Sequence, residues 1–175
     1  MCNTPNQIQP QTQTQCRTVT APDPDTTARL AARLGRVLVG GDVILLHGPV
    51  GAGKSHFARA LIQARLADLG RYEDVPSPTF TLVQIYDLGG IDLWHADLYR
   101  LTDPHECLEL GLDHAFESAI CLIEWPDRLG EYAPKTAVSL HIRPGDQADT
   151  RHLEFCTSTE HGRNILTALC DGDVT

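Results

Sequence analysis

One stretch of the chain combines the residue types and the spacing of a phosphate-binding loop. Residues 48–55 read GPVGAGKS and fit the pattern G-x-x-x-x-G-K-[ST]. Glycines in such a turn let successive backbone N–H groups point at one anion, and the N-terminus of the helix that follows adds its positive dipole end. The lysine supplies a charge for the outer phosphates, and the serine hydroxyl is a ligand for Mg²⁺. The residues expected to hold a nucleotide here are Gly48, Val50, Gly51, Ala52, Gly53, Lys54 and Ser55.

The elements around this loop distinguish a binding site from a chance run of glycines. Residues 43–47 are aliphatic and partly β-branched, which predicts a buried strand. Apolar residues then recur at helical spacing from Ala58 to Leu69, and Gly70 is placed to end the helix. A lysine at the start of that helix opposes the dipole unless an anion lies beside it. Strand, loop and helix together favour nucleotide binding over a chance match.

A phosphate loop needs a carboxylate for the magnesium shell, which usually comes from the end of another strand. Glu124 ends the apolar run 120–123, so we expect it at the edge where open α/β sheets bind ligands. Asp97 lies in the run HADLYR, whose alternation puts it on one face with His95. The predicted catalytic residues are Lys54, Asp97 and Glu124, and the predicted metal ligands are Ser55 and Glu124.

Plainer interpretations of the same residues stay open. Glu124 could be a solvent-facing strand end, and Asp97 could form a structural pair with Arg100. Trp125 offers a flat face on which a base can stack, although packing in the core is the commoner use of tryptophan. The segment PSPTFT carries hydroxyls, including that of Thr79, which could meet a γ-phosphate as a switch. A simple connecting turn explains that segment nearly as well.

The rest of the chain predicts the domain that positions these groups. Strands 80–86 and 91–98 flank two glycines, which is typical of an antiparallel hairpin. The fold class is α/β, a single P-loop NTPase-like domain over residues 17–170 with a mixed central sheet flanked by helices. Further elements are an edge strand at 17–21, a helix that starts at PDPD and ends at glycines 40 and 41, a short helix through Cys107 and Leu110, strands at 119–123, 138–142 and 152–156, and a closing helix at 164–169.

Length, composition and charge restrict the classes of function. The 175 residues suffice for one domain, and 42% hydrophobic with 21% charged residues is close to globular averages. Residues 1–16 are rich in Gln and Thr and are expected to form a flexible tail, and residues 171–175 a second tail. The net charge of −9 opposes direct binding to a phosphate backbone. We therefore expect any contact with nucleic acid to be made through partners.

The cysteines and the apolar runs indicate the compartment. The six cysteines are at least 14 residues apart and form no C-x-x-C pair, so we expect reduced thiols and no zinc site. The longest apolar run, residues 43–46, is far shorter than a membrane-spanning helix, and no signal-peptide pattern opens the chain. A cytoplasmic protein without membrane contact is expected.

Four motifs in order, GPVGAGKS, SPTFTL, HADLYRL and IEWPDRL, resemble the bacterial TsaE (YjeE) family over about residues 21–155. The resemblance implies a small P-loop ATPase, with ATP and Mg²⁺ as cofactors, that is required for threonylcarbamoyl modification of adenosine in tRNAs reading ANN codons. It implies that the TsaB and TsaD proteins are partners and perform the transfer, and that tRNA is met only through them. We expect slow hydrolysis by the chain alone, because no arginine finger is evident in the sequence.

The resemblance also implies roles for single residues. The family carries two threonines after the loop lysine, whereas this chain has Ser55 and then His56. His56 replaces a threonine hydroxyl that could touch the α-phosphate. Serine keeps the metal ligand, but the histidine puts the usual nucleotide affinity in doubt. By motif, Asp97 orients water or the metal shell, Trp125 lies near the base, Arg151 opens a late strand near the nucleotide, and Asp25 and Thr26 close over the adenine.

Two other classes of function compete with this interpretation. A small-molecule kinase uses the same loop but needs a mobile lid with arginines, and no arginine cluster follows the loop. A nucleotide switch or binding module is suggested by the D-x-x-G match at residues 87–90. No N-K-x-D for guanine follows, and a hairpin turn explains these glycines.

Overall fold

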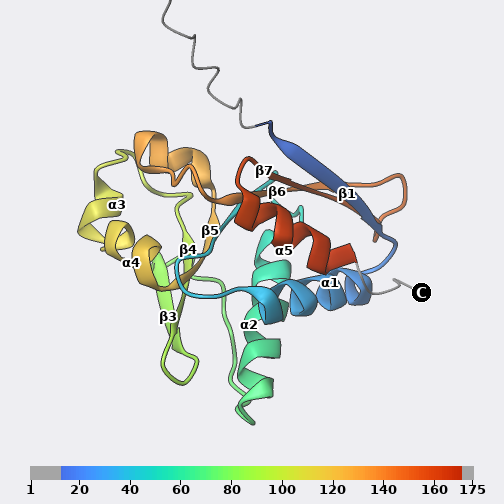
Figure 1. Cartoon of the computed structure of the whole chain (residues 1–175), viewed down its shortest axis with the longest axis horizontal. Helices are drawn as coiled ribbons and strands as arrows, with labels where there is room; N and C mark the ends of the chain where they lie inside the picture. Colours follow the sequence, from blue (N-terminus) through green and yellow to red (C-terminus); the bar gives the residue numbers. More distant parts are fainter. Residues whose placement is uncertain (1–12, 171–175) are drawn as a thin grey trace, which may run out of the picture.

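A seven-stranded mixed sheet forms the centre of the molecule, and helices cover both of its faces (Figure 1). The computed structural model describes residues 13–170. The strands are β1 (Gln15–Ala21), β2 (Val43–His47), β3 (Val83–Asp87), β4 (Asp92–Asp97), β5 (Ile120–Glu124), β6 (Val138–Pro144) and β7 (Arg151–Thr157). Their order across the sheet is β1-β7-β6-β2-β5-β4-β3. The central strands β6, β2, β5 and β4 are parallel, whereas β7, β1 and β3 pair antiparallel with their neighbours.

Five α-helices and one 3-10 helix connect or flank these strands. The first helix begins where predicted, because the Asp23 side chain accepts a hydrogen bond from the Thr26 N–H at 2.6 Å and Pro24 occupies the first turn. Within residues 13–170 no helix is long and apolar enough to cross a membrane. The helices are α1 (Pro24–Val37), α2 (Lys54–Asp68), α3 (Glu106–Glu109), α4 (Leu112–Ser118), η1 (Pro126–Tyr132) and α5 (Glu160–Cys170).

The sheet separates two hydrophobic cores. Alternation along β2 sends Ile44 and Leu46 into the core beneath α1, α2 and α5. The alternate residues Val43 and Leu45 join the core beneath α3, α4 and η1. Among the described residues, β1, β7 and β6 contribute side chains to the first core alone. The second face of these three strands is consequently polar, and Glu154 and Cys156 lie half-buried on it.

The structure confirms the predicted fold class and the antiparallel hairpin, whose strands are β3 and β4. The predicted edge strand is confirmed as β1, but it begins at Gln15, two residues earlier than expected. The first helix ends at Val37, short of the glycines at 40 and 41, and the closing helix begins at Glu160 rather than at 164. The helices α4 and η1 were not predicted. The parts of the predicted tails at residues 1–12 and 171–175 lie outside the described residues.

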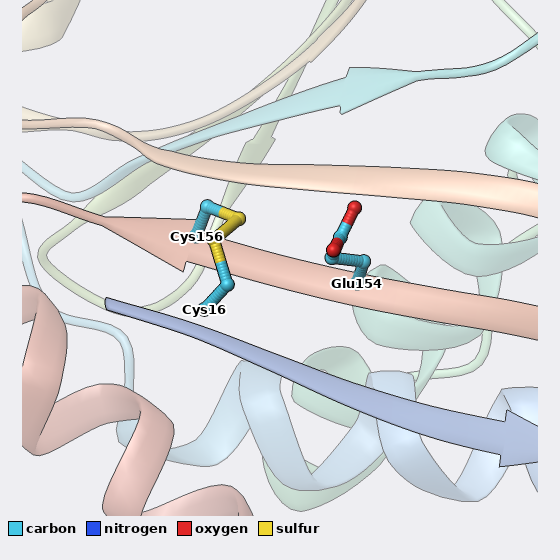
Figure 2. A group of neighbouring side chains, drawn as sticks. All are labelled: Cys16, Glu154 and Cys156. Carbon is cyan, nitrogen blue, oxygen red and sulfur yellow. A yellow bond between two sulfur atoms is a disulfide. The ribbon is translucent and has the colours of Figure 1, made fainter. Parts of the chain in front are cut away.

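The expectation that all cysteines are reduced is wrong for one pair. Cys16 and Cys156 form a disulfide between β1 and β7 (Figure 2). The sequence did not indicate this disulfide, because the two cysteines are 140 residues apart and only the strand pairing places them opposite each other. Cys107 and Cys121 are free and buried, and burial raises the pKa of Cys121 to about 12, so this thiol packs in the core. Cys2 and the side chain of Cys170 lie outside the described part of the chain.

Candidate active site

The loop between β2 and α2 adopts a backbone that requires glycine at several positions. Gly48, Gly51 and Gly53 have φ angles of +147°, +77° and +110°, a range that side chains other than glycine rarely adopt. A Cβ at Gly48 would lie 2.5 Å from the backbone oxygen of Ile142, so a side chain there would collide with β6. Gly53 caps α2, whose first turn leaves N–H groups without acceptors inside the helix. The loop thus has the features of an anion site at a helix N-terminus.

Lys54 lies buried inside this loop. Its Nζ donates hydrogen bonds to the backbone oxygens of Gly48 at 2.7 Å and Pro49 at 2.9 Å. The ring of Trp125 covers the same amine, with the centroid 4.0 Å from Nζ. Burial lowers the pKa of Lys54, and the charges of Glu124 and Asp97 oppose that shift. A half-desolvated cation next to a helix N-terminus attracts an anion such as a phosphate.

The two predicted carboxylates lie side by side at the carboxyl ends of β4 and β5, where Asp97 pairs with Glu124 in the strand register. Both are buried, with 5% of Asp97 and 2% of Glu124 exposed. Glu124 Oε2 accepts a hydrogen bond from the Ser55 hydroxyl at 2.9 Å, and its Oε1 lies 2.9 Å from His95 Nε2. Glu124 is therefore not a solvent-facing strand end.

Asp97 is held by Thr79, from the segment PSPTFT for which a switch and a connecting turn were both left open. Its Oδ2 accepts a hydrogen bond from the Thr79 hydroxyl at 3.0 Å, and its Oδ1 accepts one from the Tyr99 N–H at 3.1 Å. The alternative pair with Arg100 does not form, because that guanidinium donates to the backbone oxygen of Phe80 at 2.6 Å. The carboxylate thus stays directed toward the phosphate loop rather than toward an arginine.

One cavity of about 380 Å³ joins these groups. The hydroxyl of Ser55 and the carboxylate of Glu124 both line it, hydrogen-bonded to each other, and hard oxygen ligands of this kind suit Mg²⁺. The donor set therefore fits the metal that the sequence predicts. The cavity is lined by Val50, Gly51, Lys54, Ser55, Thr79, Asp97, Tyr99, Glu124 and Trp125.

A second cavity, of about 270 Å³, lies on the other side of the loop. Arg151 borders it and donates from Nε to the backbone oxygen of Ala52 at 2.9 Å, which ties β7 to the phosphate loop. His56 Nε2 lies 3.0 Å from the backbone oxygen of Pro24, which ties the start of α2 to the start of α1. The cavity is lined by Pro24, Thr27, Gly51, Gly53, His56, Asp149 and Arg151.

Comparison with known proteins identifies the family. Residues 21–153 match the family described as "Threonylcarbamoyl adenosine biosynthesis protein TsaE". The chain belongs to the TsaE family. Proteins named "tRNA threonylcarbamoyladenosine biosynthesis protein TsaE" include one from Haemophilus influenzae, 36% identical over 128 residues, or 73% of this chain and 77% of that protein. One from Bacillus subtilis is 36% identical over 145 residues, or 82% and 85%. One from Nostoc is 40% identical over 130 residues, or 71% and 76%.

A solved structure shows the same fold. The crystal structure of Bacillus subtilis YdiB superposes with a TM-score of 0.73 and 28% sequence identity, over 90% of this chain and 96% of that one. The TsaE resemblance stated from the four motifs is thereby confirmed, and the family has its role in threonylcarbamoyladenosine biosynthesis on tRNA.

Trp125 lies against the lysine of this TsaE-family site, and its contact with a base stays a prediction. Its ring covers the Lys54 amine and lies 4.9 Å from the ring of Tyr99. The backbone of Trp125 has φ +58°, an uncommon conformation for a bulky residue, and η1 begins at the next residue. Trp125 thus covers the lysine of the loop and lines the same cavity as the two carboxylates.

The second cavity contains groups that the sequence did not indicate. Thr27 and Asp149 come from α1 and from the turn before β7, so no local pattern links them to the TsaE phosphate loop. Asp25 is exposed and, like Thr26, is not among the lining residues. A contact of Asp25 with adenine stays a prediction, whereas Arg151 and His56 do border this cavity.

Proposed function

We propose that the chain is the ATPase component of tRNA threonylcarbamoyladenosine formation, binding ATP with Mg²⁺ in the loop at residues 48–55 and hydrolysing it slowly by itself. One observation carries the proposal. A single cavity brings together the loop lysine, a hydroxyl–carboxylate pair suited to a metal, and a second buried carboxylate. A module that only binds nucleotide needs the lysine and the metal pair but not the second buried carboxylate.

Each group of the cavity has a part in phosphate release. Lys54 and the loop amides would hold the outer phosphates, and Ser55 with Glu124 would hold Mg²⁺, which neutralises charge on the phosphates when bound. Asp97, fixed by the Thr79 hydroxyl, would orient the attacking water. Since Asp97 and Thr79 are hydrogen-bonded, a shift of the segment PSPTFT would move the carboxylate with it.

The cations near the site explain why hydrolysis by the isolated chain should be slow. Lys54 is the one Lys or Arg among the residues that line the 380 Å³ cavity. Two arginines close in sequence or space to the site are engaged elsewhere, Arg100 at the oxygen of Phe80 and Arg151 at the oxygen of Ala52. A positive charge for the transition state would therefore have to come from a partner or from a rearrangement.

The rim of the site suits a protein partner. Val50, Phe80 and Tyr99 are exposed by 79%, 87% and 50%, although large apolar side chains are usually buried. Exposed apolar groups beside a functional cavity are typical of interaction surfaces. We propose that the TsaB and TsaD proteins contact this rim in the cytoplasm. The net charge of −9 supports contact with tRNA through these partners alone.

ATP hydrolysis by the purified chain, alone and with a matched TsaB–TsaD pair, tests the proposal. Phosphate release should rise with the partners and should be lost in Lys54→Ala and in Glu124→Ala. The exposed Lys135 is the other lysine of the chain, so Lys135→Ala is a matched control that should behave as wild type. Nucleotide binding without partner stimulation, with the phosphate passed to a metabolite, would instead support a small-molecule kinase.

A further inference from the structure

The disulfide lies where reagents in solution can reach it. Cys16 is exposed and Cys156 half-buried, on the polar face of the outer strands (Figure 2). Figure 2 shows Glu154 on the same side of β7, and its carboxylate lies within 4.8 Å of both sulfur atoms. The free thiols of Cys107 and Cys121 are buried, and burial raises the pKa of both. Among cysteines with described side chains, this pair is the accessible one.

The strand that the disulfide holds ends at the nucleotide site. β1 is an edge strand and pairs with β7 alone, from Gln15 opposite Thr157 to Ala21 opposite Arg151. The disulfide therefore fixes the far end of a short ladder whose near end carries Arg151. A strand bonded on one side opens more readily than a central strand.

Three contacts lie between the near end of this ladder and the phosphate loop, and the one from Arg151 reaches the loop itself. The hydroxyl of Thr150 donates to the backbone oxygen of Pro22 at 3.4 Å, directly after β1. The backbone oxygen of Pro24 meets the His56 ring, and the guanidinium of Arg151 holds the oxygen of Ala52. A displacement of β1 would thus move residues that line the 270 Å³ cavity.

We propose that Cys16–Cys156 is a reversible thiol–disulfide exchange site whose state adjusts nucleotide binding. The reaction partner is an external dithiol. One of its thiolates attacks a sulfur of the pair, the Cys16–Cys156 bond breaks, and a mixed disulfide forms. The second thiol of the reagent then displaces the protein sulfur. Two electrons and two protons pass to the protein, which gains two thiols, and the reagent leaves as its own disulfide.

The two states differ in how firmly β1 is held. The intact bond keeps the start of β1 on β7, whereas the dithiol form leaves that end with strand hydrogen bonds alone and allows it to fray. Arg151 and the turn before α1 then lose part of their support. The nucleotide-binding part of this inference depends on the proposed function, but release of the strand does not.

The experiment compares the oxidised and the dithiothreitol-reduced full chain, in a background with Cys2→Ser and Cys170→Ser, which leaves the buried Cys107 and Cys121 as the other thiols. Both samples are first treated with a chelator and desalted, because two thiols beside Glu154 could retain a soft metal. Amide hydrogen exchange of residues 15–21 reports strand release, and calorimetry with ADP and Mg²⁺ reports nucleotide binding. Cys16→Ser serves as the permanently open control.

Reduction should speed exchange in residues 15–21 and weaken ADP binding by roughly three- to tenfold, and Cys16→Ser should match the reduced chain and ignore dithiothreitol. Equal exchange in both states, or four rather than two titratable thiols in the denatured oxidised sample, would overturn the exchange site, because Cys107 and Cys121 account for two. Faster exchange with unchanged ADP affinity would overturn its coupling to the nucleotide. Absence of ADP binding in both states would refute the proposed function while the exchange data still decide strand release.

Discussion

Replacing His95 tests how Glu124, the carboxylate that we propose binds Mg²⁺, is held. His95 is 1% exposed, and its Nε2 lies 2.9 Å from Glu124 Oε1, while the other oxygen of Glu124 meets Ser55. His95 Nδ1 is buried without a partner in the described structure. Because an unpaired N–H at Nδ1 would be costly, we assign the proton to Nε2, which donates a hydrogen bond to the carboxylate.

His95→Leu keeps the side-chain volume and removes this donor. A hydrogen bond to a charged group contributes about 1.5–3 kcal/mol, and loss of the orphaned Nδ1 offsets part of that, so we expect a loss of about 1–2 kcal/mol in unfolding free energy. The freed Glu124 would also rotate away from Ser55. Loss of such an outer partner weakens metal sites about 10- to 100-fold, so the Mg²⁺ concentration needed for half-maximal nucleotide binding should rise at least about tenfold.

Titration of Mg²⁺ at a fixed concentration of a fluorescent ADP analogue measures this requirement, and thermal unfolding measures stability. His95→Gln should restore much of the Mg²⁺ response, because its amide places a donor near the Nε2 position. A packing role alone would lower the melting temperature in both variants and leave the Mg²⁺ requirement unchanged. That result, or equal Mg²⁺ requirements for the Leu and Gln variants, would refute the reasoning.

Three further predictions concern the surroundings of the loop. Arg151→Ala removes the hydrogen bond to Ala52 and should weaken ADP binding about tenfold by calorimetry, since a charged donor contributes about 1.5–3 kcal/mol. Burial lowers the pKa of His47, so the unfolded chain binds the proton first as the pH falls below 6.5. At acid pH, His47→Gln should lose less unfolding free energy than wild type, by under about 1 kcal/mol, as measured by urea unfolding. A dependence of unfolding free energy on pH equal to that of wild type would contradict this. Phe80→Ala should keep ADP binding but reduce stimulation by TsaB–TsaD, whereas Tyr72→Ala, equally exposed at 87%, should leave stimulation intact.

The phosphate loop and the acidic strand ends could be predicted because each is a local pattern. The glycines and Lys54 lie within eight consecutive residues, and an apolar run ends at Glu124. Contacts between distant segments could not be predicted in the same way. The bond of Thr79 with Asp97 and that of Arg151 with Ala52 depend on which strands are neighbours, and the sequence does not state strand order.

The short elements and the disulfide were missed for related reasons. α4 and η1 are seven residues each, too short for a clear helical period, and η1 contains Gly130 in a non-helical conformation. Cys16 appeared to belong to a polar tail, because the segment before it buries few apolar groups. The pairing of β1 with β7 makes Cys16 part of the domain, and this pairing cannot be deduced from the amino-acid composition.

Strand order explains why the site gathers at one edge of the sheet. The strands β2, β5 and β4 are adjacent and parallel, so their carboxyl ends present the phosphate loop, Glu124 and Asp97 in sequence along that edge. β7 is antiparallel to β6, so its first residue, Arg151, lies at the same edge, and so does the last residue of β1. Cys16 and Cys156 lie toward the opposite edge. A change at the disulfide can therefore reach the loop along the β1–β7 ladder while leaving the buried carboxylates in place, so it should alter nucleotide affinity more than the Mg²⁺ requirement.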